Sequence, residues 1–214
     1  MSISLPNGAL VAIASGYGAP KAMSDVSNAN PGVATLAALH GVVSGDFLEV
    51  TSGWSRLTDK IVKAGNVAVN DVPLLGIDTS LTSVYPADGG AGSVRVITGW
   101  TQLSQILNSS SSGGEQQFLE YQFLEGDKQN RIPTVKSASG LTFSVADDPT
   151  QPGYILASTA NDDRLPRAVR ITLPNGSAIV YNMYITLNKT PSLTINEIMA
   201  CEVTMSMLAE PVRY

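Results

Sequence analysis

Three strand-like runs that follow one another in the last quarter of the chain constrain its fold most. They span residues 168–173, 177–187 and 195–208, and in each run apolar residues alternate with mostly polar ones. This period of two puts the apolar side chains on one face of a sheet. Residues 173–176, Leu-Pro-Asn-Gly, separate the first two runs and are typical of a tight hairpin turn, because Pro presets φ and Asn-Gly tolerates positive φ. The pattern predicts an antiparallel meander with one dry face, which requires no catalytic residue.

The composition favours one β-rich domain with long loops. A chain of 214 residues is long enough for one substantial domain. Hydrophobic residues make up 43% of the chain and charged residues only 14%, below the usual share of about a quarter, so disorder is not expected. The 19 glycines and 12 prolines indicate many turns. A surface with so few charges is typical of a subunit that associates with copies of itself.

The charge balance and the single cysteine exclude several classes of protein. The net charge is −5, the pI is about 4.8 and no basic run occurs, whereas phosphate binding needs clustered Lys and Arg. One cysteine excludes an internal disulfide and a cysteine-built metal site. No stretch approaches 18 consecutive apolar residues, and the N-terminus has no signal-peptide pattern. We therefore expect a soluble protein, made in a cytoplasm, with no membrane segment.

Residue patterns that carry chemistry are missing. His40, the only histidine, has no Cys, Asp or Glu at ligand spacing, and neither a nucleophile elbow nor a phosphate-binding loop occurs. The carboxylate pairs at 147–148 and 162–163 lie in polar loops, where they are expected to be solvated or to flank a helix rather than to cleave a glycoside. Cys201 is on the apolar side of its run and is expected to be a buried thiol. The sequence predicts neither an enzyme nor a cofactor or metal site.

The rest of the chain is less regular. Residues 1–41 are small and polar and are interpreted as an N-terminal arm, in which residues 9–14 could form a short strand. Residues 52–93, interrupted by Pro and Gly, are interpreted as a long loop. A short helix face is predicted from Trp100, Leu103 and Leu107, a flexible segment at residues 109–114, and a helix at residues 154–160. Further strands are expected at residues 46–51, 94–97, 119–123 and 141–145. The order shows no βαβ repetition, which argues against a parallel sheet.

Three passages resemble a known family. They are residues 45–52, residues 170–176 and residues 205–214, which follow one another around the predicted helix at a characteristic spacing. With them the chain resembles the major tail (tail tube) proteins of long-tailed bacteriophages, most strongly over residues 140–214. The resemblance implies a single tail tube domain over residues 1–214: an antiparallel β-sandwich or barrel with one flanking helix, long loops and an extended N-terminal arm.

The resemblance also implies a function in the virion. Proteins of this family form hexameric rings that stack into a tube, and the inner sheets of six subunits close into a β-barrel through which DNA passes without specific binding. The implied partners are other copies of the chain, the tape measure protein, the tail terminator and the baseplate or tip. The implied location is the virion tail, assembled in the cytoplasm of the bacterial host. The segments that fit assembly arms are residues 1–41, 52–93 and 108–117.

An acidic chain suits a DNA channel, because carboxylates repel phosphate. Candidate lumen or groove carboxylates, which could equally be ordinary solvated groups, are Glu120, Asp127, Glu197 and Glu202. Candidate assembly contacts are Trp54, Tyr85 and Trp100. The alternative is a monomeric β-sandwich module that binds carbohydrate or another surface, with the same three aromatic residues as its binding platform.

Overall fold

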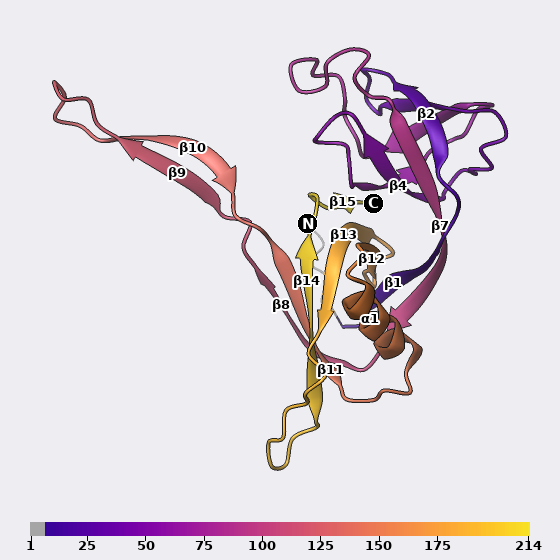
Figure 1. The fold of residues 1–214 in the computed structure, drawn as a ribbon, viewed down its shortest axis with the longest axis vertical. Helices are drawn as coiled ribbons and strands as arrows, with labels where there is room; N and C mark the ends of the chain where they lie inside the picture. Colours follow the sequence, from indigo (N-terminus) through magenta and orange to yellow (C-terminus); the bar gives the residue numbers. More distant parts are fainter. Residues whose placement is uncertain (1–6) are drawn as a thin grey trace.

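The computed structural model describes residues 7–214, which form two β-rich lobes and a projecting hairpin (Figure 1). Twelve strands and a short thirteenth form one continuous antiparallel network, and two further strands form a separate ribbon. The single helix of this region is α1 (Pro152–Asp163). The strands are β1 (Leu10–Tyr17), β2 (Lys21–Val26), β3 (Val33–Leu36), β4 (Phe47–Ser52), β5 (Ile61–Ala64), β6 (Asp71–Leu75), β7 (Gly92–Leu103), β8 (Ile106–Ser112), β9 (Gln116–Tyr121), β10 (Asn130–Lys136), β11 (Gly140–Ala146), β12 (Arg167–Thr172), β13 (Ala178–Leu187), β14 (Ala200–Met207) and β15 (Val212–Arg213).

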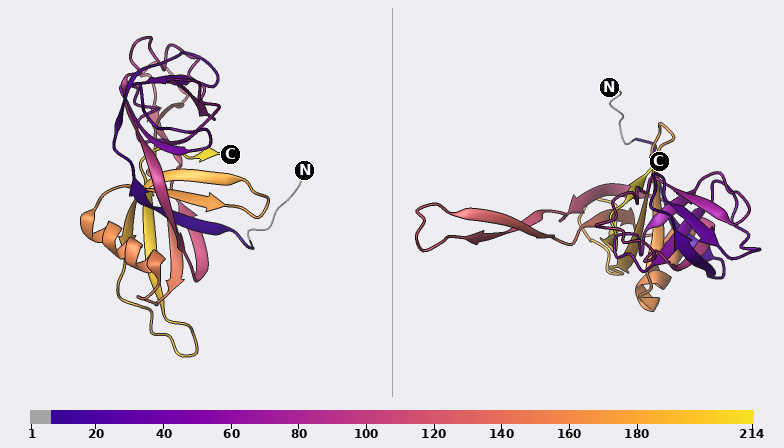
Figure 2. Two further views of the ribbon diagram at one scale, coloured as in Figure 1. Left: turned by 90° about the vertical axis from the view of Figure 1, so that its right-hand side faces the viewer. Right: turned by 90° about the horizontal axis from the view of Figure 1, so that it is seen from above.

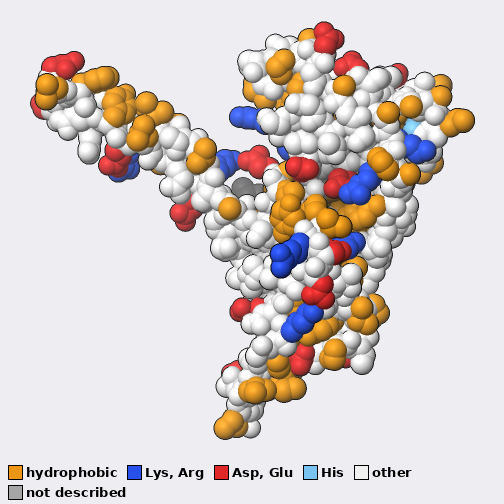
Figure 3. Space-filling view, viewed as in Figure 1, with side chains coloured by type: hydrophobic (Ala, Val, Ile, Leu, Met, Phe, Trp, Pro, Cys, Tyr) orange, Lys and Arg blue, Asp and Glu red, His pale blue; other side chains and the backbone are white. Residues whose placement is uncertain are grey.

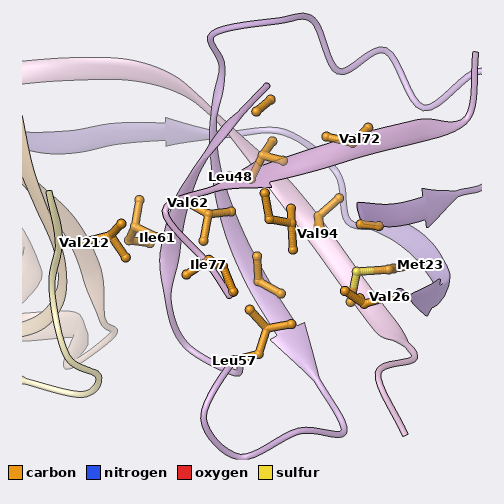
Figure 4. Close-up of a cluster of buried hydrophobic side chains, with 14 of the residues drawn as sticks. Met23, Val26, Leu48, Leu57, Ile61, Val62, Val72, Ile77, Val94 and Val212 are labelled. Carbon is orange, nitrogen blue, oxygen red and sulfur yellow. The ribbon is translucent and has the colours of Figure 1, made fainter. Parts of the chain in front are cut away.

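The first lobe, here called the barrel lobe, is a closed antiparallel barrel. Its strand order is β2-β3-β6-β5-β4-β7, and β2 also pairs with β7, which closes the ring. Closure leaves no strand edge exposed. Alternate side chains of these strands point inward and form a dry core, shown in Figure 4. Its most deeply buried members include Leu36, Leu48, Val50, Leu57, Val62, Val72 and Leu74.

The second lobe, here called the helix lobe, continues the network through the long strand β7. Residues 92–96 of β7 belong to the barrel, whereas residues 97–103 pair with β1. The order then runs β1-β12-β13-β14-β11-β8. Helix α1 packs against β13, β7 and β1 and closes a second core (Figure 2). This core includes Ile13, Leu103, Phe143, Ala157, Ala160, Val169, Met183, Cys201, Val203 and Met205.

The C-terminal meander is confirmed. The three predicted runs correspond to β12, β13 and β14, which pair antiparallel in sequence. The turn at residues 173–176 is present: Gly176 has φ +84°, and the Leu173 N–H donates to the Ser177 carbonyl at 2.8 Å. The helix is present and somewhat longer than predicted. The third run starts as a strand only at Ala200, and residues 188–199 form a loop instead.

The expected N-terminal arm is wrong for residues 10–36, and residues 1–6 lie outside the described residues. Strand β1 lies between β7 and β12 in the middle of the network, and the side chain of Ile13 is fully buried. Strands β2 and β3 are part of the barrel. The small Ala14 of β1 packs, fully buried, among the barrel-lobe core residues. Small side chains chosen for close packing do not produce a strong alternation in hydrophobicity.

The expected loop at residues 52–93 is also largely structured. It contains β5, β6 and the start of β7, and Leu57 in one of its turns is fully buried. The Pro and Gly residues that suggested a loop lie at tight packing points of the barrel. An added Cβ at Gly65 would come within 2.9 Å of the Pro73 side chain, and the Gly65 N–H donates to the Pro73 carbonyl at 2.7 Å. Whether this segment takes part in assembly stays a prediction.

The helix expected at residues 100–107 is wrong. Trp100 pairs with Ala14 and Leu103 with Val11 in β7, and Leu107 belongs to β8. The Ser-rich segment expected to be flexible is largely strand as well, since residues 106–112 pair with β11. Long-range pairing to β1 and β11 overrides the local spacing, as strand formation depends strongly on context.

Candidate functional site

The outer face of β8, β11, β14 and β13 is a polar surface, here called the polar face. Opposite residues in antiparallel strands share a face, so Ser110, Thr142 and Thr204 lie in one row across three strands, and Thr186 extends it onto β13. The next rows hold Asn108, Ser144 and Glu202 on one side, and Ser112, Gly140, Ser206 and Tyr184 on the other. The opposite side chains of β11, β13 and β14 point into the helix-lobe core.

The polar face carries hydroxyl and amide groups with almost no charge. In the three rows just described, Glu202 is the one charged residue and no Lys or Arg occurs. Most of these side chains are exposed, and Thr142 and Ser144 are half-buried. A surface of this kind hydrogen-bonds water but has no cation with which to hold a phosphate.

The two borders of the polar face each have a hydrogen-bonded strand neighbour along only one of their edges. Within residues 7–214, β8 pairs with β11 and no other strand. On the far side, β12 pairs with β13 only as far as Met183, so residues 184–187 have β14 as their single strand neighbour. Unpaired edges of this kind are templates for pairing with another chain.

A long hairpin, here called the arm, projects from the end of β8 and β11 (Figures 1 and 2). It is formed by β9 and β10 and is hydrogen-bonded as a ribbon separate from the main network. Its exposed large apolar residues are Phe118, Leu119, Phe123, Leu124, Ile132 and Val135, with Leu124 at the tip fully exposed. An isolated two-stranded ribbon is marginally stable in water at best, so the arm calls for a second surface to pack against.

The four predicted lumen carboxylates do not lie together. Glu202 is exposed on the polar face, as a lumen residue would be if that face lined the tube. Glu120 lies on the arm and pairs with Arg131, and Asp127 lies in the turn at its tip. Glu197 is exposed in the loop between β13 and β14. Sequence alternation identified Glu202 correctly as facing outward from its strand, but it carried no information about where the other three lie in space.

The predicted aromatic contacts lie mostly in the interior. Trp54 and Tyr85 are buried in the barrel-lobe core with an edge-to-face contact between rings 5.1 Å apart, and the Trp54 indole donates to the Pro86 carbonyl at 2.8 Å. Neither ring is therefore available as a sugar platform or as a surface contact in this conformation. Trp100 is half-buried between the lobes, in an edge contact with Phe47 and under the guanidinium of Arg170.

Charged residues at the junction of the lobes were missed by the sequence analysis. Glu49 is 8% exposed and accepts hydrogen bonds from Arg95 and from the buried amide of Asn182. The Arg95 guanidinium also lies 4.6 Å from the ring centroid of Tyr17, whose hydroxyl accepts the Ala168 N–H. The sequence signal that could have found this site is Glu49 itself, a charged residue between the apolar residues Leu48 and Val50 of a predicted strand.

His40 and the carboxylate pairs, for which the sequence predicted no catalytic role, form hydrogen bonds or ion pairs within the fold. Both ring nitrogens of His40 bond to backbone, at Val42 and Val69. Asp148 accepts bonds from Thr150 and Gln151 before α1, and these bonds lower its pKa to about 2. Asp163 pairs with Arg167 just after the helix. Asp148 lies in the turn before α1, as expected for a helix-flanking carboxylate, whereas Asp162 and Asp163 are the last two residues of the helix and not part of a loop.

Cys201 is the buried thiol that its position in the strand predicts. Its sulfur lies 3.4 Å from Asp147 Oδ1 and 3.9 Å from the Tyr154 hydroxyl. Burial is the main cause that raises the pKa of Cys201, and burial together with Cys201 raises the pKa of Tyr154 to about 12. Because the thiolate is the reactive form, this environment keeps Cys201 unreactive at neutral pH.

Among residues 7–214, no group of three or more His, Cys, Asp or Glu side chains is arranged to hold a metal ion. No helix in this region has the length and apolar character needed to cross a membrane.

Comparison with known sequences decides the family. The family model described as "Phage tail tube protein, TTP" matches residues 52–214, about three quarters of the chain. The chain belongs to the phage tail tube protein family. This confirms the resemblance and, with the structure, the mainly β antiparallel fold with one helix. A search of the curated proteins finds no match.

Several solved structures are similar to about half of this tail tube protein. One is "Virion of native gene transfer agent (GTA) particle", with 9% identity and a TM-score of 0.42 over 54% of this chain and 88% of that chain. Another is the sheath-tube complex of an extracellular contractile injection system (PVC), with 17% identity and a TM-score of 0.36 over 49% and 78%. A third is the anti-feeding prophage tube-terminating cap, with 19% identity and a TM-score of 0.35 over 49% and 78%.

Proposed function

We propose that this tail tube protein assembles with copies of itself into stacked hexameric rings, and that the resulting tube conducts DNA into the host. Family membership supports a structural role in the virion tail. The ring, the stacking and the passage of DNA are inferences from the surfaces described above.

The polar face is the observation that carries the proposal. Its two borders, β8 and residues 184–187 of β13, each have one side free for a neighbour's strand. Joining β8 of one subunit to β13 of the next would continue the sheet around the ring and remove both edges. The polar face would then line the lumen. Every subunit would contribute Glu202, and none of the three rows of this face contains a cation. DNA would meet a hydrated wall that repels phosphate weakly and binds it nowhere.

The arm supplies the second contact of the assembly. It extends away from both lobes, and its apolar side chains are uncovered in the single subunit (Figure 3, where the arm extends to the upper left). Packing against neighbouring subunits would bury these side chains and stabilise the ribbon. The role is structural rather than catalytic. The further partners in this proposal are the tape measure protein, the tail terminator and the baseplate or tip, with assembly in the host cytoplasm.

Electron microscopy of the purified protein tests the proposal. Negative-stain images should be taken over a range of protein and salt concentrations. Sixfold rings, or hollow tubes whose cross-sections show sixfold symmetry, are the expected result. Monomers at every concentration and salt, or closed oligomers without a central channel, would contradict the proposal. The alternative of a monomeric binding module is less favoured, because two of its three proposed platform rings, Trp54 and Tyr85, are buried and the third, Trp100, is half-buried.

A further inference from the structure

The loop between β13 and β14 exposes apolar side chains at one end of the helix lobe. It comprises residues 188–199 and projects at the lower end of the molecule in Figure 1. Leu193 is 79% exposed, Ile195 86% and Ile198 65%. Side chains of this size are not left in water at such a density without a reason, and a cluster of them at the tip of a projecting loop indicates a contact surface. Glu197, also exposed, gives this tip a negative charge.

A groove lies at the opposite end of the same strands. Ala146 pairs with Ala200 at the loop end of β11 and β14, whereas Gly140 pairs with Ser206 and Ser112 at the other end. There the chain forms two adjoining hollows of about 690 and 590 Å³, which share Lys136 and residues 208–210. We call the two together the end groove. Its apolar lining includes Val135, Ala138, Met207, Leu208, Ala209 and Pro211.

The end groove carries an excess of positive charge. It is lined by three cations, Arg56, Lys60 and Lys136, and by two carboxylates, Asp59 and Glu210. Lys136 pairs with Glu210. Arg56 and Lys60 form no ion pair with any carboxylate among residues 7–214, and Arg56 is exposed. Burial is the main cause that lowers the pKa of Lys60, and Glu210 opposes this effect.

We propose that residues 193–199 of one subunit dock into the end groove of the subunit stacked on it, with Glu197 facing Arg56. The loop and the groove are at opposite ends of β14, so a translation roughly along this strand brings the loop of one copy to the groove of the next. The exposed apolar side chains of the loop would pack against the apolar lining of the end groove, and the carboxylate of Glu197 would lie near the guanidinium of Arg56. A contact between two different surfaces of the same chain forms an open filament when the operation that relates the copies is a translation, as it is here along β14. This inference rests on the proposed function and specifies which surfaces join one ring to the next.

The experiment compares five variants of the full-length protein by electron microscopy and sedimentation, with circular dichroism and thermal unfolding as checks of folding. The double variant Leu193→Ser/Ile195→Ser removes the apolar tip. Glu197→Arg and Arg56→Glu each place two like charges at the contact. The variant that combines both changes restores a pair of opposite charges, with the positive charge now on the loop and the negative charge in the groove. Ile155→Ser is the matched control, because Ile155 is an exposed apolar residue of α1, at 52%, that lines neither hollow and lies outside the segments expected to take part in assembly.

The loop variant should still form single rings, but the protein concentration needed for tubes should rise by about tenfold or more, which corresponds to the loss of about 1.4 kcal/mol per contact. Each charge variant should raise that concentration as well, and the combined variant should return it to within about threefold of the wild type. The Ile155→Ser control should assemble normally. Tubes formed by the loop variant at the wild-type concentration, or a combined variant no better than its single changes, would overturn the inference and leave the proposed function standing. A wild-type protein that forms neither rings nor tubes would overturn the proposed function and this inference with it.

Discussion

Glu49 joins the two lobes through a buried carboxylate. Its oxygens accept hydrogen bonds from Arg95 in the same lobe and from Asn182 of β13 in the helix lobe. Removing one partner of a buried pair leaves the other without its hydrogen bond. Since the Arg95 side chain is 40% exposed, water compensates part of this loss. We expect Glu49→Gln to lower the free energy of unfolding by about 1–3 kcal/mol in urea titrations. Glu120→Gln is the control, because its exposed pair with Arg131 should contribute less than about 1 kcal/mol. Equal effects of the two changes would contradict the structural role of Glu49.

Tyr214 ties the end of the chain to the barrel lobe and makes stability sensitive to high pH. Its hydroxyl accepts the Lys63 N–H at 2.7 Å and donates to the Leu75 carbonyl at 3.1 Å. Burial raises the pKa of Tyr214 to about 12 from the ordinary value of 10.0. Below about pH 10 both folded and unfolded chains keep this proton, and between about pH 10 and 12 the unfolded chain loses it first, so stability falls over that window.

We therefore expect Tyr214→Phe to lower the free energy of unfolding by about 1 kcal/mol at neutral pH, because the Lys63 N–H loses its partner. The same change should make the decline between about pH 8 and pH 11 shallower, although Tyr154, whose pKa is also raised to about 12, preserves part of it. Urea titrations of both proteins at the two pH values provide the measurement. An unchanged decline in the variant would show that Tyr214 is not the group responsible.

The arm is the element whose stability depends most on a partner. Its apolar side chains contribute little to the folded monomer because they remain exposed, with Leu119 at 57% and Val135 at 70%. We expect Leu119→Thr/Ile132→Thr, two arm residues outside the end groove, to change monomer stability by less than about 0.5 kcal/mol while strongly reducing ring or tube formation. Ile155→Thr on α1 is a control with similar exposure, 52%, on a different face. Sedimentation and thermal unfolding measure the two effects separately. Normal assembly of the arm variant would show that the arm is not an assembly contact.

Sequence reasoning succeeded for strands that have one face in solvent and the other in the core, because polar and apolar residues alternate along them. β12, β13, β14 and the turn at residues 173–176 meet this condition. It predicted residues 94–97 of β7 as a strand but failed for residues 100–103, where a helix was expected, and it did not place β1 in the middle of the network. In β7, Trp100 faces the barrel lobe and Leu103 the helix-lobe core, so both faces are covered and alternation is lost. Glu202 on the polar face could be predicted to point outward, whereas the meeting of Glu49, Arg95 and Asn182 depends on pairings between distant segments that no local pattern encodes.

At the scale of the whole molecule, the polar face and the end groove differ in charge. The net charge is −5, the three rows of the polar face contain no cation, and two cations without ion pairs lie in the end groove instead. If the polar face lines the lumen, the absence of cations there is a functional property, because each Lys added to it would hold a phosphate and release counterions. The same substitution on an outer surface would leave passing DNA unaffected.

Thr204→Lys and Thr142→Lys place cations side by side on the polar face, since the two residues pair directly. We expect tubes of the double variant to retain DNA that wild-type tubes do not, with binding that weakens steeply between about 50 and 200 mM salt. Cosedimentation of assembled tubes with short duplex DNA at the two salt concentrations measures this. Thr159→Lys/Ser158→Lys on α1 is the control of equal charge, because the helix lies on the opposite side of the sheet from the polar face. DNA retention by both double variants to the same extent would indicate ordinary surface binding and would place the polar face outside the lumen. Retention by the polar-face variant alone assigns that face to the channel wall.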